Sequence, residues 1–214
     1  MPRPRKKIKP TWAELRQQRS ALERFELFLP LLQLKQRQLQ SAILETDGEY
    51  QELKEAADTI AENISAYSTV LNDISGVNIN TLSEPEDVKT IRTNVAGVKV
   101  PVFESAEFPR AEYSLFATPP WVDRALSDHR KKNLHRVKLE ILEQKLALLQ
   151  AELKKVMQRV NLFEKIIIPE ARENIRRIRI VLSDRMTAAV ARAKFAKEKM
   201  EERELESKSE VDFL

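Results

Sequence analysis

Residues 15–39 read LRQQRSALERFELFLPLLQLKQRQL, and the spacing of their apolar side chains decides the fold. Alternating steps of three and four residues lead from Leu15 to Leu39 and continue in the same rhythm to Ile74. Fifteen of the eighteen positions on this seam are apolar, whereas about eight would be expected from the hydrophobic content of 42%. A seam that repeats every 3.5 residues faces a partner helix continuously only in a left-handed coiled coil. The first third of the chain is therefore predicted to be one helix of a coiled coil.

A second seam with the same spacing runs from Leu139 to Ile167. Beyond Ile167 the apolar stripe takes two steps of four residues around Pro169 and then continues to Ala193. Such a stutter is predicted to unwind the supercoil locally. Two long helices joined by a short connection pack most simply as an antiparallel pair. The residues that define the two seams are Leu15, Leu22, Phe25, Leu29, Leu146, Leu149, Leu153, Val160, Ile167, Ile178 and Leu182.

The character of the chain changes between the two seams. Two of the three glycines fall in residues 76–118, and the 3.5-residue period disappears there. Val98, Val100 and Val102 alternate with other residues, which predicts a short strand or hairpin. Pro101 restricts that strand to the edge of a sheet, because proline cannot donate a backbone hydrogen bond. We expect a small head that joins two helical arms.

The predicted fold class is all-α: a long antiparallel two-helix coiled coil with a small middle head that contains a short strand or hairpin. Thr11 and Glu14 have the spacing of a capping box at the start of the first helix. Pro30 lies inside the seam without disturbing its phase and is expected to bend the helix rather than end it. The predicted segments are a basic tail at 1–9, helices at 10–75 and 119–200, the head at 76–118, and a charged tail at 201–214.

The composition agrees with a long-helix protein and excludes several other classes. Charged residues make up 33% of the chain and aromatic residues 6%, with three glycines in 214 residues. There is no cysteine, so disulfides and thiol chemistry are excluded. Lys and Arg total 37 against 33 for Asp and Glu, an excess too small to indicate nucleic acid by itself. Because no apolar run approaches about twenty residues, we expect a soluble, cytoplasmic chain with no direct membrane insertion.

Catalytic motifs are missing from the sequence. No Gly-x-x-x-x-Gly-Lys loop is present to hold phosphates. His129 and His135 are six residues apart, so they do not share a helix face as a metal-binding pair would. We therefore expect no catalytic residue, no cofactor and no metal ligand.

A stretch near the C-terminus is basic and rich in alanine. Residues 185–197 contain no acidic residue, and their cations are Arg185, Arg192, Lys194 and Lys197. One interpretation is a helix end at which the helix dipole favours positive charge. The other is a slim, basic tip that fits inside a partner, since small residues keep a helix thin. The sequence leaves both interpretations open.

A family resemblance is carried by three segments. Residues 158–169, QRVNLFEKIIIP, resemble the Arg-Arg-Val-Asn-Ala-Leu-Glu…Ile-Pro signature of the D subunit of the V-type/A-type rotary ATPases. Residues 97–101 resemble the central Gly-Val-x-Val-Pro segment of that family, and residues 31–37 resemble its leucine-, lysine- and arginine-bearing N-terminal helix. The matching motif residues are Gly97, Val98, Pro101, Arg159, Asn161, Glu164 and Pro169.

The resemblance implies the central rotor shaft of an ATP synthase. In such complexes the coiled coil inserts into a ring of catalytic A and B subunits. The middle segment meets the F subunit and the socket subunit above the membrane ring. ATP chemistry belongs to the A subunits, so the shaft would be non-catalytic and would couple ATP hydrolysis or synthesis to H⁺ or Na⁺ transport by rotation. The expected location is cytoplasmic and peripheral to the membrane, as part of a membrane-attached complex.

The alternatives are a non-rotary antiparallel scaffold and a nucleic-acid-binding protein. A scaffold explains the seams but gives no reason for the Gly97–Pro101 segment. Nucleic-acid binding would work through residues 1–9 and 172–197, and those stretches lack interleaved aromatic side chains. We therefore expect no nucleic acid among the partners.

Overall fold

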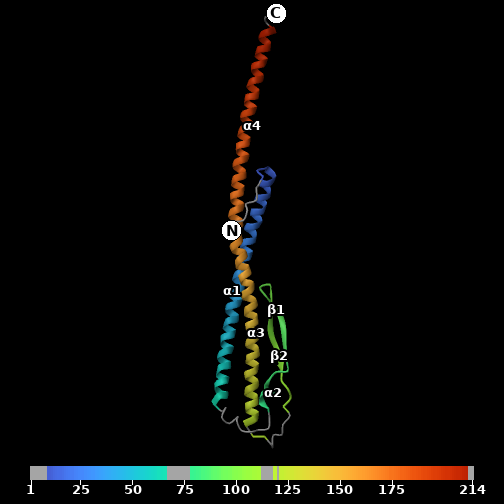
Figure 1. Cartoon of the computed structure of the whole chain (residues 1–214), viewed down its shortest axis with the longest axis vertical. Coiled ribbons are helices and arrows are strands. Elements are labelled where there is room, and N and C mark those ends of the chain that lie inside the picture. Colours follow the sequence, from blue (N-terminus) through green and yellow to red (C-terminus); the bar gives the residue numbers. More distant parts are fainter. Residues whose placement is uncertain (1–8, 67–77, 112–117, 120, 212–214) are drawn as a thin grey trace. The chain divides into compact units, whose positions relative to one another are not determined.

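The computed structural model describes residues 9–66, 78–111, 118, 119 and 121–211, with side chains as far as residue 203. Four α-helices and two strands follow one another as α1, α2, β1, β2, α3 and α4, with a π-helical turn, η2, between α3 and α4 (Figure 1). Most of the predicted basic tail lies outside these residues. So do the seam positions Tyr67, Leu71 and Ile74 and the predicted helix stop Gly76.

Helix α1 (Trp12–Ala66) begins directly after the predicted cap. The hydroxyl oxygen of Thr11 accepts a hydrogen bond from the backbone N–H of Glu14 at 3.2 Å. The carboxylate of Glu14 accepts from Gln18 at 2.9 Å, so it turns along the helix rather than back to Thr11. The helix continues through Pro30, because a single missing N–H removes one bond of a ladder that runs over 55 residues.

The seam on α1 is the buried face of the helix. Every seam position from Leu15 to Ile64 is buried or half-buried, and Leu39 has no exposed area. The pattern includes a polar member, Thr46, which is 1% exposed. Its hydroxyl donates to the carbonyl of Ala42 at 2.7 Å, which satisfies the buried donor within the helix. The 3.5-residue period therefore identifies the packed face even where the residue type does not.

The head consists of the short helix α2 (Ile79–Ser83) and an antiparallel hairpin of β1 (Asp87–Val95) and β2 (Val98–Glu107). Val95 pairs with Val98, so the turn has two residues, Ala96 and Gly97. Both have positive φ, 50° and 81°, as a type I′ turn requires. The predicted hairpin is confirmed, and Pro101 lies on an edge because both strands of a two-stranded sheet are edges.

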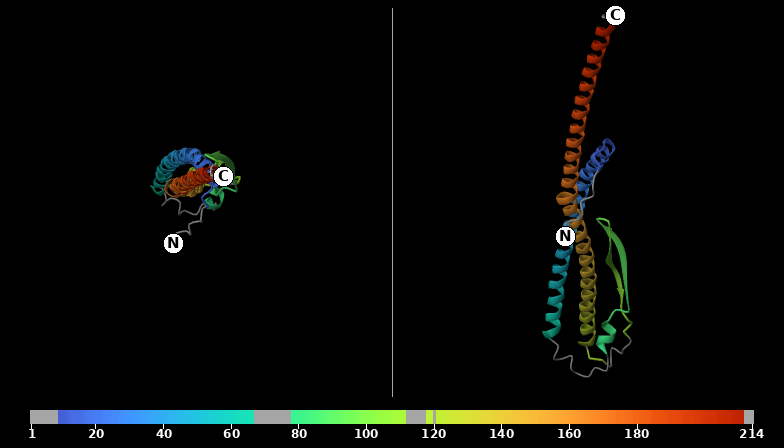
Figure 2. Two further views of the ribbon diagram at one scale, coloured as in Figure 1. Left: turned by 90° about the horizontal axis from the view of Figure 1, so that it is seen from above. Right: turned by 45° about the horizontal axis from the view of Figure 1, so that its top comes forward.

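Strand β2 packs against α3. Val100 has no exposed area, and the ammonium group of Lys138 lies 5.1 Å from the centre of the Phe103 ring. Val102 is 37% exposed. A β-bulge at Lys89/Thr90 shifts the register of the ladder, so residues nearer the base of the hairpin are paired one position further along β2 than a regular ladder would place them. Figure 2 shows the hairpin alongside α3.

The second helical arm consists of three consecutive elements. Helix α3 (Trp121–Leu162) leads into the π-helical turn η2 (Phe163–Ile167), and α4 (Ile168–Val211) follows without a break. The structure thus continues helix past residue 200, where the sequence analysis ends its second arm. Glu, Lys, Arg and Met dominate residues 197–204, and these residue types favour helix without any packing partner.

The chain divides into two compact units. A terminal unit contains residues 1–31 and 159–214, and a middle unit contains residues 32–158. In the terminal unit Leu15 packs with Ile178 and Leu182, and Leu22 lies against the same cluster. In the middle unit Glu49 of α1 pairs with Lys145 of α3 at 3.2 Å. In both units α1 runs antiparallel to its partner helix. The predicted all-α class with antiparallel helix pairing and a small head is confirmed.

Two glycine substitutions should have opposite effects on stability. Gly97→Ala is expected to lower the free energy of unfolding by about 1–2 kcal/mol, because an alanine is strained at φ 81°. A methyl group there would lie 3.6 Å from Lys35 Nζ, an ordinary contact, so the cost arises from the backbone. Gly48 lies in the middle of α1, and a methyl group added there would have nothing within 4 Å. Gly48→Ala is therefore expected to raise the free energy of unfolding by about 1 kcal/mol. Urea unfolding measures both, and a stabilising Gly97→Ala would contradict the assigned turn.

Candidate functional site

The motif segment 158–169 contains a defect in the regular helix. The backbone N–H of Ile168 donates to the carbonyl of Phe163, five residues earlier, where an α-helix would use a carbonyl four residues earlier. Pro169 follows immediately. Its ring has no N–H and would collide with the carbonyl of Lys165 in a regular α-helix, so a wider turn relieves the contact. The π-turn thus has a cause in the sequence.

The π-turn changes which residues face α1. An inserted residue moves the buried positions one place along the chain, from 167, 170, 174, 177 and 181 to 168, 171, 175, 178 and 182. The residues at the shifted positions are between 3% and 8% exposed. The stutter predicted from the spacing around Pro169 is therefore realised as one extra residue in a single helical turn rather than as unwinding over a longer stretch.

Side chains of the signature segment divide between two faces. Arg159, Asn161 and Glu164 are exposed, while Val160 is 7% exposed and lies on the seam. The ring of Phe163 meets the ring of Phe25 edge to face, with centroids 5.6 Å apart and planes at 72°. The exposed polar members thus have surface for contacts outside the chain, and the apolar members fix the helix pair.

The remaining predicted seam residues lie against the partner helix to different degrees. Leu149 and Leu182 are buried, and the other members are buried or half-buried. The half-buried members are Leu22, Phe25, Leu29, Leu146, Leu153 and Ile167.

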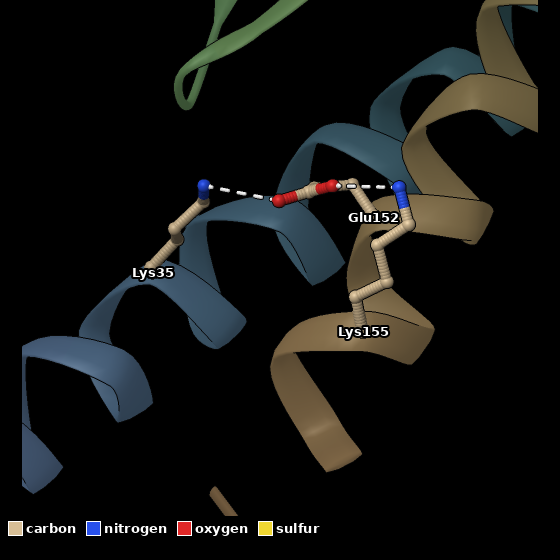
Figure 3. Close-up of polar contacts among 3 residues, drawn as sticks. All are labelled: Lys35, Glu152 and Lys155. Carbon is tan, nitrogen blue, oxygen red and sulfur yellow. Dashed lines mark hydrogen bonds and ion pairs between the residues drawn. The ribbon is translucent and has the colours of Figure 1, made fainter. Parts of the chain in front are cut away.

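Two segments that carry the family resemblance meet in the middle unit (Figure 3). Lys35 of α1 lies 3.4 Å from Glu152 of α3, and Lys155 lies 3.5 Å from the other carboxylate oxygen of Glu152. The turn at Gly97 comes close to the ammonium group of Lys35. Of the hairpin motif residues, Val98 and Pro101 are half-buried. The structure therefore places the tip of the hairpin beside an ion-pair network that links α1 and α3.

The charge of Glu152 depends on this network. Burial raises the pKa of the Glu152 carboxyl, but the hydrogen bond and charge of Lys35, together with those of Lys155, outweigh burial and hold the pKa below its ordinary value. Because the pKa of the Glu152 carboxyl is lower in the folded chain than in the unfolded chain, its ion pair with Lys35 stabilises the fold at pH values above the unfolded-chain pKa. That contribution is lost as the pH falls through the native pKa.

Glu152→Gln should therefore weaken the fold in a pH-dependent manner. At pH 7 we expect the free energy of unfolding to fall by about 0.5–1 kcal/mol, the range of a partly exposed ion pair. As the pH is lowered through the native pKa of Glu152, the wild-type carboxylate takes up a proton, so the difference between the two proteins should shrink toward zero. Urea unfolding at pH 7 and at a series of lower pH values tests this, with exposed Glu45→Gln on α1 as the control. If the difference in free energy of unfolding stayed constant as the pH fell, the charge of Glu152 would not be the cause of the lost stability.

Two polar side chains of α3 attach the head. The guanidinium group of Arg130 donates to the backbone carbonyls of Leu82 and Pro109, and the amide of Asn133 donates to the carbonyl of Ser83 at 2.8 Å. Ser83 is 1% exposed. No sequence pattern indicates either residue, because their partners are mainly backbone oxygens, which every residue type supplies. They bind the start and the end of the head to the same helix.

The candidate tip is a solvent-exposed stretch of helix. All side chains from Ser183 to Arg203 are exposed, including the end of the predicted apolar stripe at Met186, Ala189 and Ala193. Figure 1 shows α4 extending past the N-terminal end of α1, and beyond that end no other described element lies beside it. Its apolar members have no partner there, so this stretch has surface available for another chain.

The four predicted tip cations make few contacts. Arg185 donates to the carbonyl of Pro10 at 3.0 Å, and Lys197 lies 3.5 Å from Glu201 in the next turn. Arg192 and Lys194 are exposed and have no ion-pair partner among the described residues. The tip therefore presents cations that are not committed to the fold.

Neither a metal-binding cluster nor a membrane span is found among the described residues. None of their His, Cys, Asp and Glu side chains form a group of three or more that could hold a metal ion. His129 lines a shallow groove with Lys132 and Arg136, and burial followed by the charge of Lys132 lowers its pKa. Among the same residues, no helix is apolar over a stretch long enough to cross a bilayer.

Comparison with known proteins gives matches that span nearly the whole chain. Residues 14–198 match the family model described as the D subunit of ATP synthase. The V-type ATP synthase D subunit of Borreliella burgdorferi is 36% identical over 195 residues, which cover 89% of this chain and 94% of that protein. The V-type ATP synthase D subunits of Chlamydia caviae and Chlamydia abortus are 34% and 35% identical, each over 94% of this chain and 97% of their own length.

Proposed function

This chain belongs to the D-subunit family of ATP synthases, and from that premise we propose that it is the central rotor shaft of a V-type ATP synthase. The shaft couples ATP hydrolysis or synthesis in a ring of A and B subunits to the transport of H⁺ or Na⁺ by rotating. The observation that carries the proposal is the extent of the match, because it includes both helical arms and the hairpin between them.

The helix pairs suit a part that transmits torque. A helix turning inside a ring must resist twisting, and two helices locked along a seam resist it better than a single helix. Each unit has its own packed seam. In the middle unit Leu39 and Leu149 have no exposed area, and in the terminal unit Leu15 packs with Ile178 and Leu182.

The candidate tip at 185–197 suits contact with the ring. A shaft that occupies several angles in turn needs shallow, interchangeable contacts, because deep and specific ones would trap one angle. Alanines keep this part of α4 slim, and Arg192 and Lys194 are exposed to solvent. We therefore assign the ring contact to Arg185, Arg192, Lys194 and Lys197.

Other subunits complete the proposed setting. The head and the exposed signature residues Arg159, Asn161 and Glu164 provide surface for the F subunit and for the socket subunit above the membrane ring. The chain itself would carry no catalytic residue, since ATP chemistry in such a complex belongs to the A subunits. It would act at the cytoplasmic side of the membrane, peripheral to the lipid.

Reconstitution tests the proposal. The chain should copurify with the F subunit at equal stoichiometry and should assemble with an A/B ring, whose ATPase rate should then change several-fold. Attaching a fluorescent bead to the head should reveal rotation in steps during ATP hydrolysis. A chain that neither joins the ring nor alters its ATPase rate would contradict the shaft function and favour a static scaffold.

A further inference from the structure

A groove on the terminal unit is lined by four arginines. Arg19 of α1 and Arg172, Arg176 and Arg179 of α4 surround a volume of about 610 Å³. We call this the basic groove. Its apolar lining includes Leu22 and Ile175 from the seam and Ile180, which is 52% exposed. The groove thus combines positive charge with accessible apolar surface.

Acidic side chains of the chain neutralise only part of this charge. Glu26 accepts from Arg172 at 2.7 Å, and Glu23 is the other carboxylate on the lining. Arg176 lies 3.8 Å from Glu173, a distance that makes a weak pair. Arg19 and Arg179 have no ion-pair or hydrogen-bond partner among the described residues. Four cations against two acids leave the lining with a net charge of +2.

The lining favours carboxylates over phosphates or nucleotides. A guanidinium group can bind a carboxylate or a phosphate through two parallel hydrogen bonds, so the choice between them depends on the rest of the lining. Arginine is also enriched at the centres of protein interfaces. The groove contains no aromatic ring on which a base could stack. Both walls are helix interiors, whose backbone N–H groups are used within the helix and cannot cradle a phosphate.

We propose that the basic groove binds an acidic segment of the A/B ring, with carboxylates held by Arg19 and Arg179 and an apolar side chain seated on Ile180. This inference rests on the proposed function and specifies a second contact of the shaft. The groove and the candidate tip lie on one helix, because Arg179 precedes Arg185 by six residues on α4. The candidate tip therefore follows the groove along α4 in the terminal unit.

The test compares two double variants of the full chain for binding to an assembled A/B ring. Arg19→Glu with Arg179→Glu reverses the two unpartnered cations of the groove. Arg24→Glu with Arg177→Glu makes the same change of net charge on α1 and α4 at exposed arginines that do not line the groove. We expect the groove variant to raise the Kd at least about tenfold at low salt and the control less than about threefold. The difference should narrow at high salt.

The outcomes separate this inference from the proposed function. Failure of the wild-type chain to bind the ring would overturn the proposed function. Equal binding by the wild type and both variants, or equal loss in both variants, would overturn the groove and leave the shaft intact. The milder pair Arg19→Gln with Arg179→Gln, checked for helix content, answers the same question if the charge reversal unfolds the chain.

A second arm tests phosphate as the ligand. Inorganic triphosphate is titrated into the wild-type chain alone and into the groove variant. We expect no saturable binding at micromolar concentrations. Tight binding at one site that disappears in the groove variant would make the groove a polyphosphate site and would overturn the proposed acidic segment.

Discussion

Deletion of Ile166 together with Pro169→Ala is expected to preserve the fold and to raise its free energy of unfolding by about 1–3 kcal/mol. The deletion removes the extra residue of the π-turn, so Ile168 and Ala171 fall into the regular 3.5-residue register that ends at Ile167 in the present chain. Removing the proline restores a backbone donor, which relieves a cost of about 3 kcal/mol in a helix interior. Chemical denaturation followed by circular dichroism measures the change.

A deletion outside the π-turn should have the opposite effect. Loss of Ala151, an exposed residue of α3, rotates the following helix by about 100° and turns Leu153, Val156 and Val160 away from the seam. Each such side chain is worth about 1.5–3 kcal/mol when buried, so the free energy of unfolding should fall by more than about 5 kcal/mol. If deletion of Ile166 and deletion of Ala151 lowered the free energy of unfolding by similar amounts, the phase shift at residues 163–167 would be refuted.

Truncation of the fully buried seam leucines should be the most damaging substitution in the middle unit. Leu39→Ala and Leu149→Ala are each expected to lower the free energy of unfolding by about 2–5 kcal/mol, because both side chains have no exposed area and a cavity would remain. Their exposed neighbours on the same helices provide matched controls. Leu44 is 73% exposed and Leu148 is 44% exposed, so Leu44→Ala and Leu148→Ala should change stability by less than about 1 kcal/mol.

Urea unfolding of the four single variants checks this pair of expectations. The double variant Leu39→Ala with Leu44→Ala should be as unstable as the sum of its single changes, because Leu44 makes little contact with the seam. Equal destabilisation by buried and exposed truncations would mean that helix propensity, rather than packing across the seam, holds the pair together.

The coiled-coil seams could be predicted because each seam residue repeats the same physical requirement. Leu15, Leu39 and Ile64 all fall on the same alternating steps of three and four residues, so a count of apolar residues at the right spacing is sufficient. The hairpin could be located for a related reason. Alternating valines at 98 and 100 mark a strand, and Gly97 marks a position with positive φ.

The π-turn could be located but not identified from the sequence. Two steps of four residues around Pro169 indicate a change of phase, and a spacing of four is compatible with an unwound supercoil or with one wide turn. The choice depends on how the chain avoids the collision between the proline ring and the carbonyl of Lys165, which is a matter of backbone geometry. The helical course of residues 201–211 was also missed, because the sequence there carries no apolar periodicity.

The basic groove could not be predicted from residue spacing along the sequence. Arg19 and Arg179 are 160 residues apart, and each is an ordinary surface arginine on its own helix. Only antiparallel packing of α1 on α4 brings them to one surface. By contrast, the tip cations at 185–197 are close together in the chain and could be found by composition.

Arg130 and Asn133 donate hydrogen bonds to carbonyl oxygens of the peptide backbone, and every amino acid supplies such an oxygen. The side chains at positions 82 and 109 can therefore change without loss of these hydrogen bonds, provided that the backbone follows the same path, whereas the hydroxyl of Ser83 also accepts from Asn133 at 3.2 Å. Surface side chains of the head can thus be substituted to suit a different partner protein, while Arg130 and Asn133 of α3 keep the head attached.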